Sequence, residues 1–195
     1  DTLEVLGTTG ADIFTVSDTA VLHDSLQAVN TFTNVAALTV TGDGGTDTFN
    51  VTPGSVPIAI DGNDPVGGTP GDTLNIDSSG ATVTPNIGPE NDEGSFDVAG
   101  TETVSYDHIE SIGVTGTGTG SVIVSGTNGD DDITVVGTGV DDFTASLNGT
   151  TATQYTNFDS LIINAMSGDD DIDVDVNNLA IGTFTVNGDL PTTSG

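Results

Sequence analysis

Several aspartates of this chain lie in glycine-rich turns, where their carboxylates could bind a hard metal ion. Residues 130–132 are three consecutive aspartates, and residues 169–171 are three more. Adjacent carboxylates repel one another at neutral pH, and Ca²⁺ relieves that repulsion because it prefers oxygen ligands. These turns favour calcium as the cofactor. The competing interpretation is that aspartate serves here only as a turn-forming residue.

The charge of the chain points to the same need for external cations. The 195 residues include 30 Asp and Glu but no Lys or Arg, so the formal net charge is −30. A folded chain of this charge repels itself unless metal ions or a very salty medium screen it. A surface adapted to high salt is therefore an alternative to calcium. The charge also excludes nucleic acid and anionic membranes as direct partners.

Groups suited to catalysis are scarce. The chain has no Cys and two His, which argues against zinc, copper and thiolate sites. Neither His23 nor His108 stands at a spacing that would make it a catalytic base, and we expect both on the surface. Asp141 and Asp142 could serve an Asp-dependent β-helix glycan hydrolase, but such enzymes usually need Arg or Lys to hold acidic sugars. We therefore predict no catalytic residues.

Two motifs recur along the chain. The pattern G/A-x-x-G-x-D-x-[F/I]-x-V occurs at residues 7–16, 42–51, 126–135 and 165–174. An aromatic motif, aromatic-x-x-apolar-x-x-[L/I]-x-[V/I], occurs at residues 32–40, 106–114 and 155–163. Together they divide one continuous β-rich body into a first repeat unit (1–76), a short divergent unit (77–119) and a second repeat unit (120–195).

The two ends of the chain carry a related signal. Residues 184–195 resemble the start of residues 58–76, and joining Gly195 to Asp1 recreates the order Gly-Asp-Thr-Leu found at 71–74. We therefore expect one period of a longer tandem array. In such an array Leu3 and Val5 of a neighbouring copy would occupy the environment of Leu74 and Ile76.

The hydrophobic pattern predicts an all-β fold. Short runs alternate apolar residues with Thr, Asn, Asp or Ser, no window has a helical apolar period, and no stretch is long and apolar enough to span a membrane. Segments 17–36 and 136–157 are expected as protruding hairpins, the second with the turn signal Asn148-Gly149. Repetition favours a β-solenoid or β-helix-like fold, in which stacked coils build one core. The alternative is two tandem Ig-like β-sandwiches.

The acidic turns resemble the nonapeptide of hemolysin-type, or RTX, calcium-binding repeats, G-G-x-G-x-D-x-U-x. The resemblance implies that glycine carbonyls and the motif aspartate bind Ca²⁺ and that residue U packs inside. The copies here are 35 or 39 residues apart (Asp12 to Asp47, Asp131 to Asp170), not nine, and the second glycine is replaced. The implied inward residues are Phe14, Phe49, Ile133 and Ile172. The predicted metal ligands are Asp12, Asp43, Asp47, Asp130, Asp131, Asp132, Asp169, Asp170 and Asp171.

The sequence pattern of the repeats, in which the aromatic motif runs into the acidic turn, also resembles repeat regions of large secreted bacterial surface proteins. We therefore expect a structural element of an extracellular or cell-surface protein, such as a fibre, stalk, S-layer-like coat or adhesin, stabilised by calcium. Its expected partner is itself, joined head-to-tail or as tandem repeats. Sequons at Asn50 and Asn148 could carry glycans. A carbohydrate-binding module or a glycan hydrolase remains the alternative.

Overall fold

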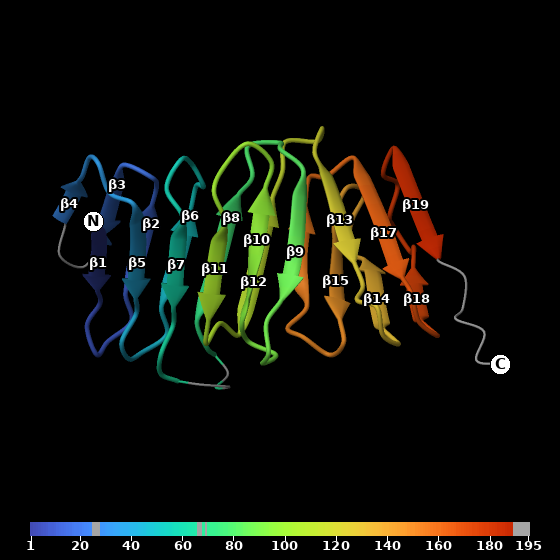
Figure 1. The fold of residues 1–195 in the computed structure, drawn as a ribbon, viewed down its shortest axis with the longest axis horizontal. Helices are drawn as coiled ribbons and strands as arrows, with labels where there is room; N and C mark the ends of the chain where they lie inside the picture. Colours follow the sequence, from blue (N-terminus) through green and yellow to red (C-terminus); the bar gives the residue numbers. More distant parts are fainter. Residues whose placement is uncertain (25–27, 66–67, 69, 189–195) are drawn as a thin grey trace.

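Nineteen strands form two sheets in the computed structural model, which describes residues 1–24, 28–65, 68 and 70–188. Figure 1 shows the strands side by side along the molecule, from β1 at one end to β19 at the other. Sheet A has the order β1 (Thr2–Leu6), β5 (Ala37–Thr41), β7 (Ile58–Asp61), β11 (Val104–Asp107), β10 (Gly94–Val98), β9 (Val83–Ile87), β13 (Ser121–Ser125), β17 (Ser160–Met166) and β19 (Thr183–Gly188).

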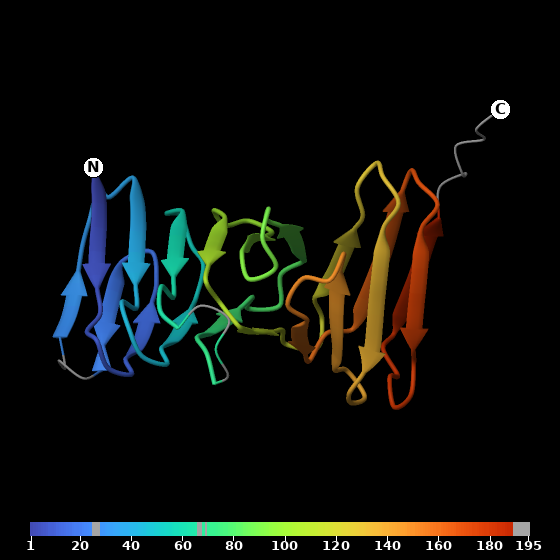
Figure 2. The ribbon, with the colours of Figure 1, turned by 90° about the horizontal axis from the view of Figure 1, so that it is seen from below.

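Sheet B has ten strands in the order β18 (Asp171–Asp175), β14 (Asp132–Gly137), β15 (Phe143–Leu147), β16 (Thr153–Thr156), β12 (Ser111–Thr115), β8 (Thr73–Asp77), β6 (Thr48–Val51), β2 (Ile13–Val16), β3 (Ala20–His23) and β4 (Ala28–Thr31). The chain passes repeatedly from a strand of sheet A to the next strand of sheet B, so its successive coils stack along the long axis (Figure 2).

The architecture confirms the all-β, β-solenoid-like prediction. Most strand pairs are parallel, as stacking of successive coils requires. Both sheets run unbroken through the two halves of the chain, which two separate sandwiches would not produce. The described residues contain no α-helix, and so none that is long and apolar enough to cross a membrane.

The core consists of columns of like residues between the two sheets. Within β6 the inward-pointing Phe49 and Val51 are buried, while the alternate Thr48 and Asn50 remain half-exposed. The strand register places Phe49 between Phe14 and Leu74 of the neighbouring coils. A single coil could not bury such residues alone, so each coil depends on its neighbours for stability.

Both expected hairpins are present, but their strands lie in sheet B and do not protrude from the body. Strands β2, β3 and β4 pair antiparallel in sequence, and so do β14, β15 and β16. The reason is hydrophobic: Val21 and Phe143, on the hairpin strands, are completely buried. A third antiparallel excursion, β9–β10–β11, widens sheet A within residues 77–119.

Strands β1–β7 and β13–β19 share one pairing pattern. In each set the first strand pairs with the fifth and the fifth with the seventh in sheet A, while the second pairs with the sixth in sheet B. By this correspondence β1 matches β13. The expected match of Leu3 and Val5 to Leu74 and Ile76 is wrong, because β1 lies in sheet A and β8 in sheet B. The C-terminal loop used in that match, 190–195, lies outside the described residues.

Candidate functional site

The repeated glycine-rich turns stack on one another where the chain passes from sheet A to sheet B. The backbone N–H of Asp12 donates to Oδ1 of Asp47 at 2.7 Å, and the N–H of Asp47 donates to Oδ1 of Asp72 at 2.6 Å. The N–H of Asp72 in turn donates to Oε2 of Glu110 at 2.6 Å. We call these four residues the acid column. The carboxylates of Asp47, Asp72 and Glu110 thus take the place of the carbonyl that a regular parallel ladder would offer.

The second repeat unit builds a shorter version of the same arrangement. The N–H of Asp131 donates to Oδ1 of Asp170 at 3.1 Å. Four predicted ligands therefore fall into stacked turns: Asp12 with Asp47, and Asp131 with Asp170.

Sequence reasoning missed Asp72 and Glu110, because neither lies in a complete glycine-rich motif. A shorter signal could have found Asp72: residues 47–51 read Asp-Thr-Phe-Asn-Val and residues 72–76 read Asp-Thr-Leu-Asn-Ile. Residues 110–114, Glu-Ser-Ile-Gly-Val, keep the same acid-x-apolar-x-Val spacing.

The hairpins of sheet B supply a hydrogen-bond donor at the start of each stack. His23 Nε2 lies 2.9 Å from Oδ1 of Asp12, and the His23 ring stacks on Phe14 with 4.6 Å between ring centroids. His23 is only 1 % exposed, so the expectation of a surface histidine is wrong for this residue. Its hairpin strand carries it into the core, where its Nε2 lies within hydrogen-bond distance of the buried Asp12 carboxylate.

Asn148 has the equivalent position in the second unit. Its Nδ2 donates to Oδ1 of Asp131 at 2.7 Å, and its Oδ1 accepts the N–H of Asp132 at 2.8 Å. The residue adopts φ +55°, as the predicted Asn-Gly turn requires. The amide nitrogen of this sequon, where an N-linked glycan would attach, is thus engaged in a hydrogen bond.

Two carboxylates of the acid column bury an oxygen that has no hydrogen-bond partner among the described residues. These oxygens are Oδ2 of Asp47 and Oδ2 of Asp72, and both residues are 0 % exposed. In Asp12 and Asp131 the same oxygen accepts a backbone N–H, from Thr8 and Thr127 respectively, at 2.6 Å. An unpartnered buried carboxylate oxygen is costly, so a proton or a cation is expected to compensate it.

The protonation of the acid column reflects this burial. Burial raises the pKa of Asp72 to about 6, and the negative charges of Asp47, Glu110 and Asp61 add to the rise. Burial also raises the pKa of Asp47, with smaller contributions from Asp12 and Asp43. For each residue the backbone N–H donated from the preceding coil lowers the pKa and partly opposes the shift.

Glycines allow the coils to approach closely at this column. A Cβ on Gly42 would overlap Oδ2 of Asp47 and lie 2.9 Å from the carbonyl oxygen of Gly62. A Cβ on Gly62 would overlap Oδ2 of Asp72 and the carbonyl oxygen of His108. The absence of a side chain at each glycine thus lets carboxylate and carbonyl oxygens of neighbouring coils pack against its backbone.

The remaining predicted ligands are exposed on the turns and strand ends. The N–H of Asp169 donates to Oδ1 of Asp130 at 2.9 Å. Asp132 lies directly opposite Asp171 in the register of β14 and β18, and like charges in that position destabilise a sheet. Asp43 adopts φ +77° at the place where the family pattern has its second glycine. These five residues, Asp43, Asp130, Asp132, Asp169 and Asp171, are solvent-accessible.

Among the described residues, one group of three side chains has its ligand atoms within 4.8 Å of one another. It consists of Asp61, Asp107 and His108, all half-buried, and none of them is on the predicted list. His108 Nδ1 lies 3.0 Å from Asp61 Oδ1, and this hydrogen bond is the main cause of the raised pKa of His108. His108 adopts φ +53°, like Asn34 and Asn157 at the same place in the aromatic motif.

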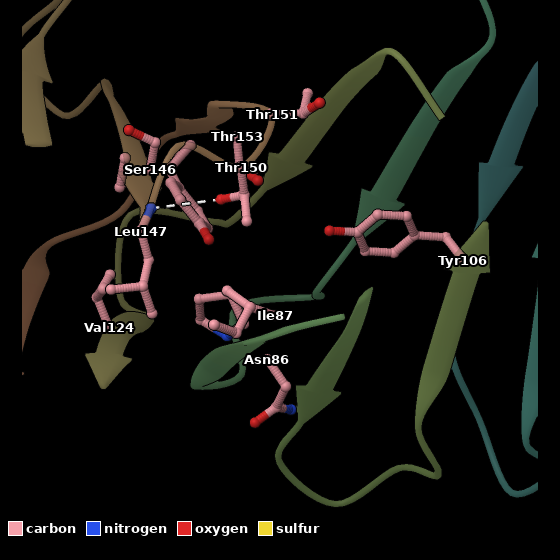
Figure 3. A pocket seen from close by; sticks show the side chains of 12 residues that line it. Asn86, Ile87, Tyr106, Val124, Ser146, Leu147, Thr150, Thr151 and Thr153 are labelled. Carbon is pink, nitrogen blue, oxygen red and sulfur yellow. Dashed lines mark hydrogen bonds between the residues drawn. The ribbon is translucent and has the colours of Figure 1, made fainter. Parts of the chain in front are cut away.

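One cavity of the described residues is small. It lies between residues of the divergent unit, including Asn86 and Tyr106, and the β15–β16 hairpin, including Leu147 and Thr150 (Figure 3). Its volume of about 30 Å³ suits a water molecule rather than a sugar. Asp142 of the expected hydrolase pair lies elsewhere, and its Oδ1 accepts the N–H of Asn157 at 2.9 Å.

Comparisons with known proteins give no match for this chain among family models, curated proteins or solved structures.

Proposed function

We propose that this protein is a structural element of an extracellular or cell-surface assembly, such as a fibre, stalk, coat or adhesin, and that calcium stabilises it. The observation that carries the proposal is the acid column: buried carboxylates stacked from coil to coil in a chain without Lys or Arg. A fold built on such a column gains stability from any cation that binds only its folded form.

The candidate ligands are of two kinds. Among the described residues, Asp47 and Asp72 have buried oxygens without hydrogen bonds, and these oxygens pack against Gly42 and Gly62 respectively. The exposed pairs Asp130–Asp169 and Asp132–Asp171 bring like charges together at the second stack. Calcium would supply positive charge at both places, and the likeness of the turns to RTX repeats supports the same ion.

Thermal unfolding tests the proposal. We expect the midpoint to rise by several degrees when CaCl₂ replaces a chelator, because an ion present at 100 times its dissociation constant adds about 2.7 kcal/mol. NaCl at equal ionic strength is the control for screening, and MgCl₂ tests selectivity. An equal gain with NaCl would support an adaptation to salt and count against specific binding.

Matched variants locate the ion. Asp47→Asn keeps an acceptor for the N–H of Asp12 but removes a charge from the column, so we expect a smaller calcium gain than in the wild type. Glu102→Gln removes the same charge from an exposed loop and should leave the calcium gain unchanged. If both variants respond to calcium as the wild type does, Asp47 is not a ligand.

A further inference from the structure

Both ends of the solenoid expose residues that belong to its core columns. On β19, Phe184 and Val186 continue the columns of Leu161 and Ile163, yet they are 40 % and 44 % exposed. On β1, Leu3 and Val5 continue the columns of Leu38 and Val40 and are only half-buried. We call the β18–β19 end the C-terminal face and the β1–β4 end the N-terminal face.

The N-terminal face is also hollowed. A recess of about 410 Å³ there is lined by Leu3, Glu4, Val5, Thr31 and Phe32. Three of these five residues are apolar, so the recess can accept an apolar side chain from a neighbouring molecule. Phe184, on the opposite face, is a large apolar side chain that lacks such cover.

Equivalent faces inside the chain show how this kind of surface is completed. β7 corresponds to β19, and its Ile58 and Ile60 are 2 % and 1 % exposed because β11 pairs with β7 in parallel. β13 corresponds to β1, and its Val122 is completely buried beside Val83 of β9, again in parallel. A parallel strand carrying apolar residues covers each of these internal faces.

We propose that the C-terminal face of one molecule binds the N-terminal face of a second copy of this chain. β19 then pairs in parallel with β1 of the next copy, which places Phe184 beside Leu3 and Val186 beside Val5. The strand directions permit this, because every strand of sheet A except β10 runs the same way. In sheet B, the free edge of β18 then lies beside β4 of the next copy. These two strands run in the same direction, so they can pair in parallel.

The contact is heterologous, so it leaves one face free on each molecule and adds copies in a line. This inference rests on the proposed structural function and gives it a partner. Charge opposes the contact, because each copy carries −30 and both faces bear exposed acids, such as Glu4 and Asp173. Association should therefore require calcium or high salt.

Single-face variants test the proposal in analytical ultracentrifugation with CaCl₂ and, separately, with NaCl. The wild type should form chains whose length grows with protein concentration. Val5→Asp should disable the N-terminal face and Val186→Asp the C-terminal face, so each variant alone should remain monomeric. An equal mixture should form a one-to-one dimer, because each variant keeps the face that the other has lost.

Ile87→Asp is the matched control, since Ile87 is also an exposed apolar residue (38 %) but lies on β9, away from both faces. It should assemble like the wild type. Circular dichroism verifies folding, and Val5→Thr and Val186→Thr replace any variant that does not fold. A wild type that stays monomeric in both salts, or a mixture that stays monomeric, overturns the inference. If calcium still raises the unfolding midpoint in that case, the proposed calcium-stabilised function stands without this contact.

Discussion

The backbone N–H of Asp47 donates to Oδ1 of Asp72 over 2.6 Å, and both side chains are completely buried. One oxygen of Asp72 therefore accepts a hydrogen bond from the neighbouring coil, while the other, Oδ2, has no hydrogen-bond partner in the described part of the chain. The same carboxylate that joins two coils also carries a desolvation cost. The stability of the stack should thus depend on what neutralises Asp72.

The first prediction concerns pH. The pKa of Asp72 is about 6 in the folded protein against 3.8 for the unperturbed group, so the folded state binds more protons between these values. By linkage, this carboxylate costs stability above pH 6, and the cost disappears as pH falls towards 4. Asp72→Asn should remove a cost of about 3 kcal/mol at most at pH 7, while its side-chain oxygen can still accept the N–H of Asp47.

Chemical denaturation in chelator at pH 7 and pH 4 measures this effect. The other acids also titrate, so the informative quantity is the difference between variant and wild type at each pH. We expect Asp72→Asn to be the more stable at pH 7 and the two proteins to converge at pH 4. A difference that does not change with pH would show that Asp72 is ionised in the folded protein down to its ordinary range.

The second prediction concerns the two histidines: His23 is buried in the core, whereas His108 is half-buried in a turn. His23→Leu keeps a side chain of similar bulk against Phe14 but removes the donor at Oδ1 of Asp12, and it should cost about 3 kcal/mol. His108→Asn should change stability by less than about 0.5 kcal/mol, because asparagine tolerates the positive φ and occupies the same motif position at Asn34 and Asn157. Urea unfolding of both variants provides the comparison, and equal losses would contradict these roles.

The third prediction compares two glycines of the glycine-rich motif, Gly42 at its first position and Gly10 at its fourth. Gly42→Ala should be destabilising by about 1–3 kcal/mol or more, since its Cβ would overlap Oδ2 of Asp47 and press on the next coil. Gly10→Ala meets nothing closer than the Thr8 hydroxyl at 3.9 Å, so it should be neutral or slightly stabilising. Thermal unfolding of the two variants tests whether close approach of the coils is what requires the first glycine.

Sequence patterns predicted the strands well because alternation of apolar and polar residues is a local property. Asp47-Thr-Phe-Asn-Val predicts a strand that begins directly after the aspartate, and β6 occupies its last four residues. The same pattern in Asp1-Thr-Leu-Glu-Val also coincides with a strand, β1, but that strand lies in sheet A. The pattern predicts where a strand begins but not which sheet the strand joins. For this reason the sequence did not predict that β1 belongs to sheet A.

The burial of His23 and the unpartnered oxygens of Asp47 and Asp72 depend on contacts between distant coils. His23 and Asp12 are adjacent only because β3 folds back on β2 within sheet B. Turn chemistry predicted that Asp12 and Asp47 lie in turns, but not that Oδ1 of Asp47 and Oδ1 of Asp72 accept a backbone N–H from the neighbouring coil. That role requires the register between coils, which no single motif contains.

The last prediction concerns Asn148, whose Nδ2 donates to Asp131 from the tip of the β15–β16 hairpin. Asn148→Asp preserves the size and the tolerance of positive φ but places a carboxylate against Oδ1 of Asp131 and removes the donor. We expect a lower unfolding midpoint at pH 7 and a recovery near pH 3, where the new carboxyl group is protonated and can donate. Asn178→Asp is the control, because Asn178 is exposed and has φ +65°. Loss of stability in Asn148→Asp that persists at pH 3, or an equal loss in Asn178→Asp, would mean that Asn148 supports the turn alone and not the carboxylate of Asp131.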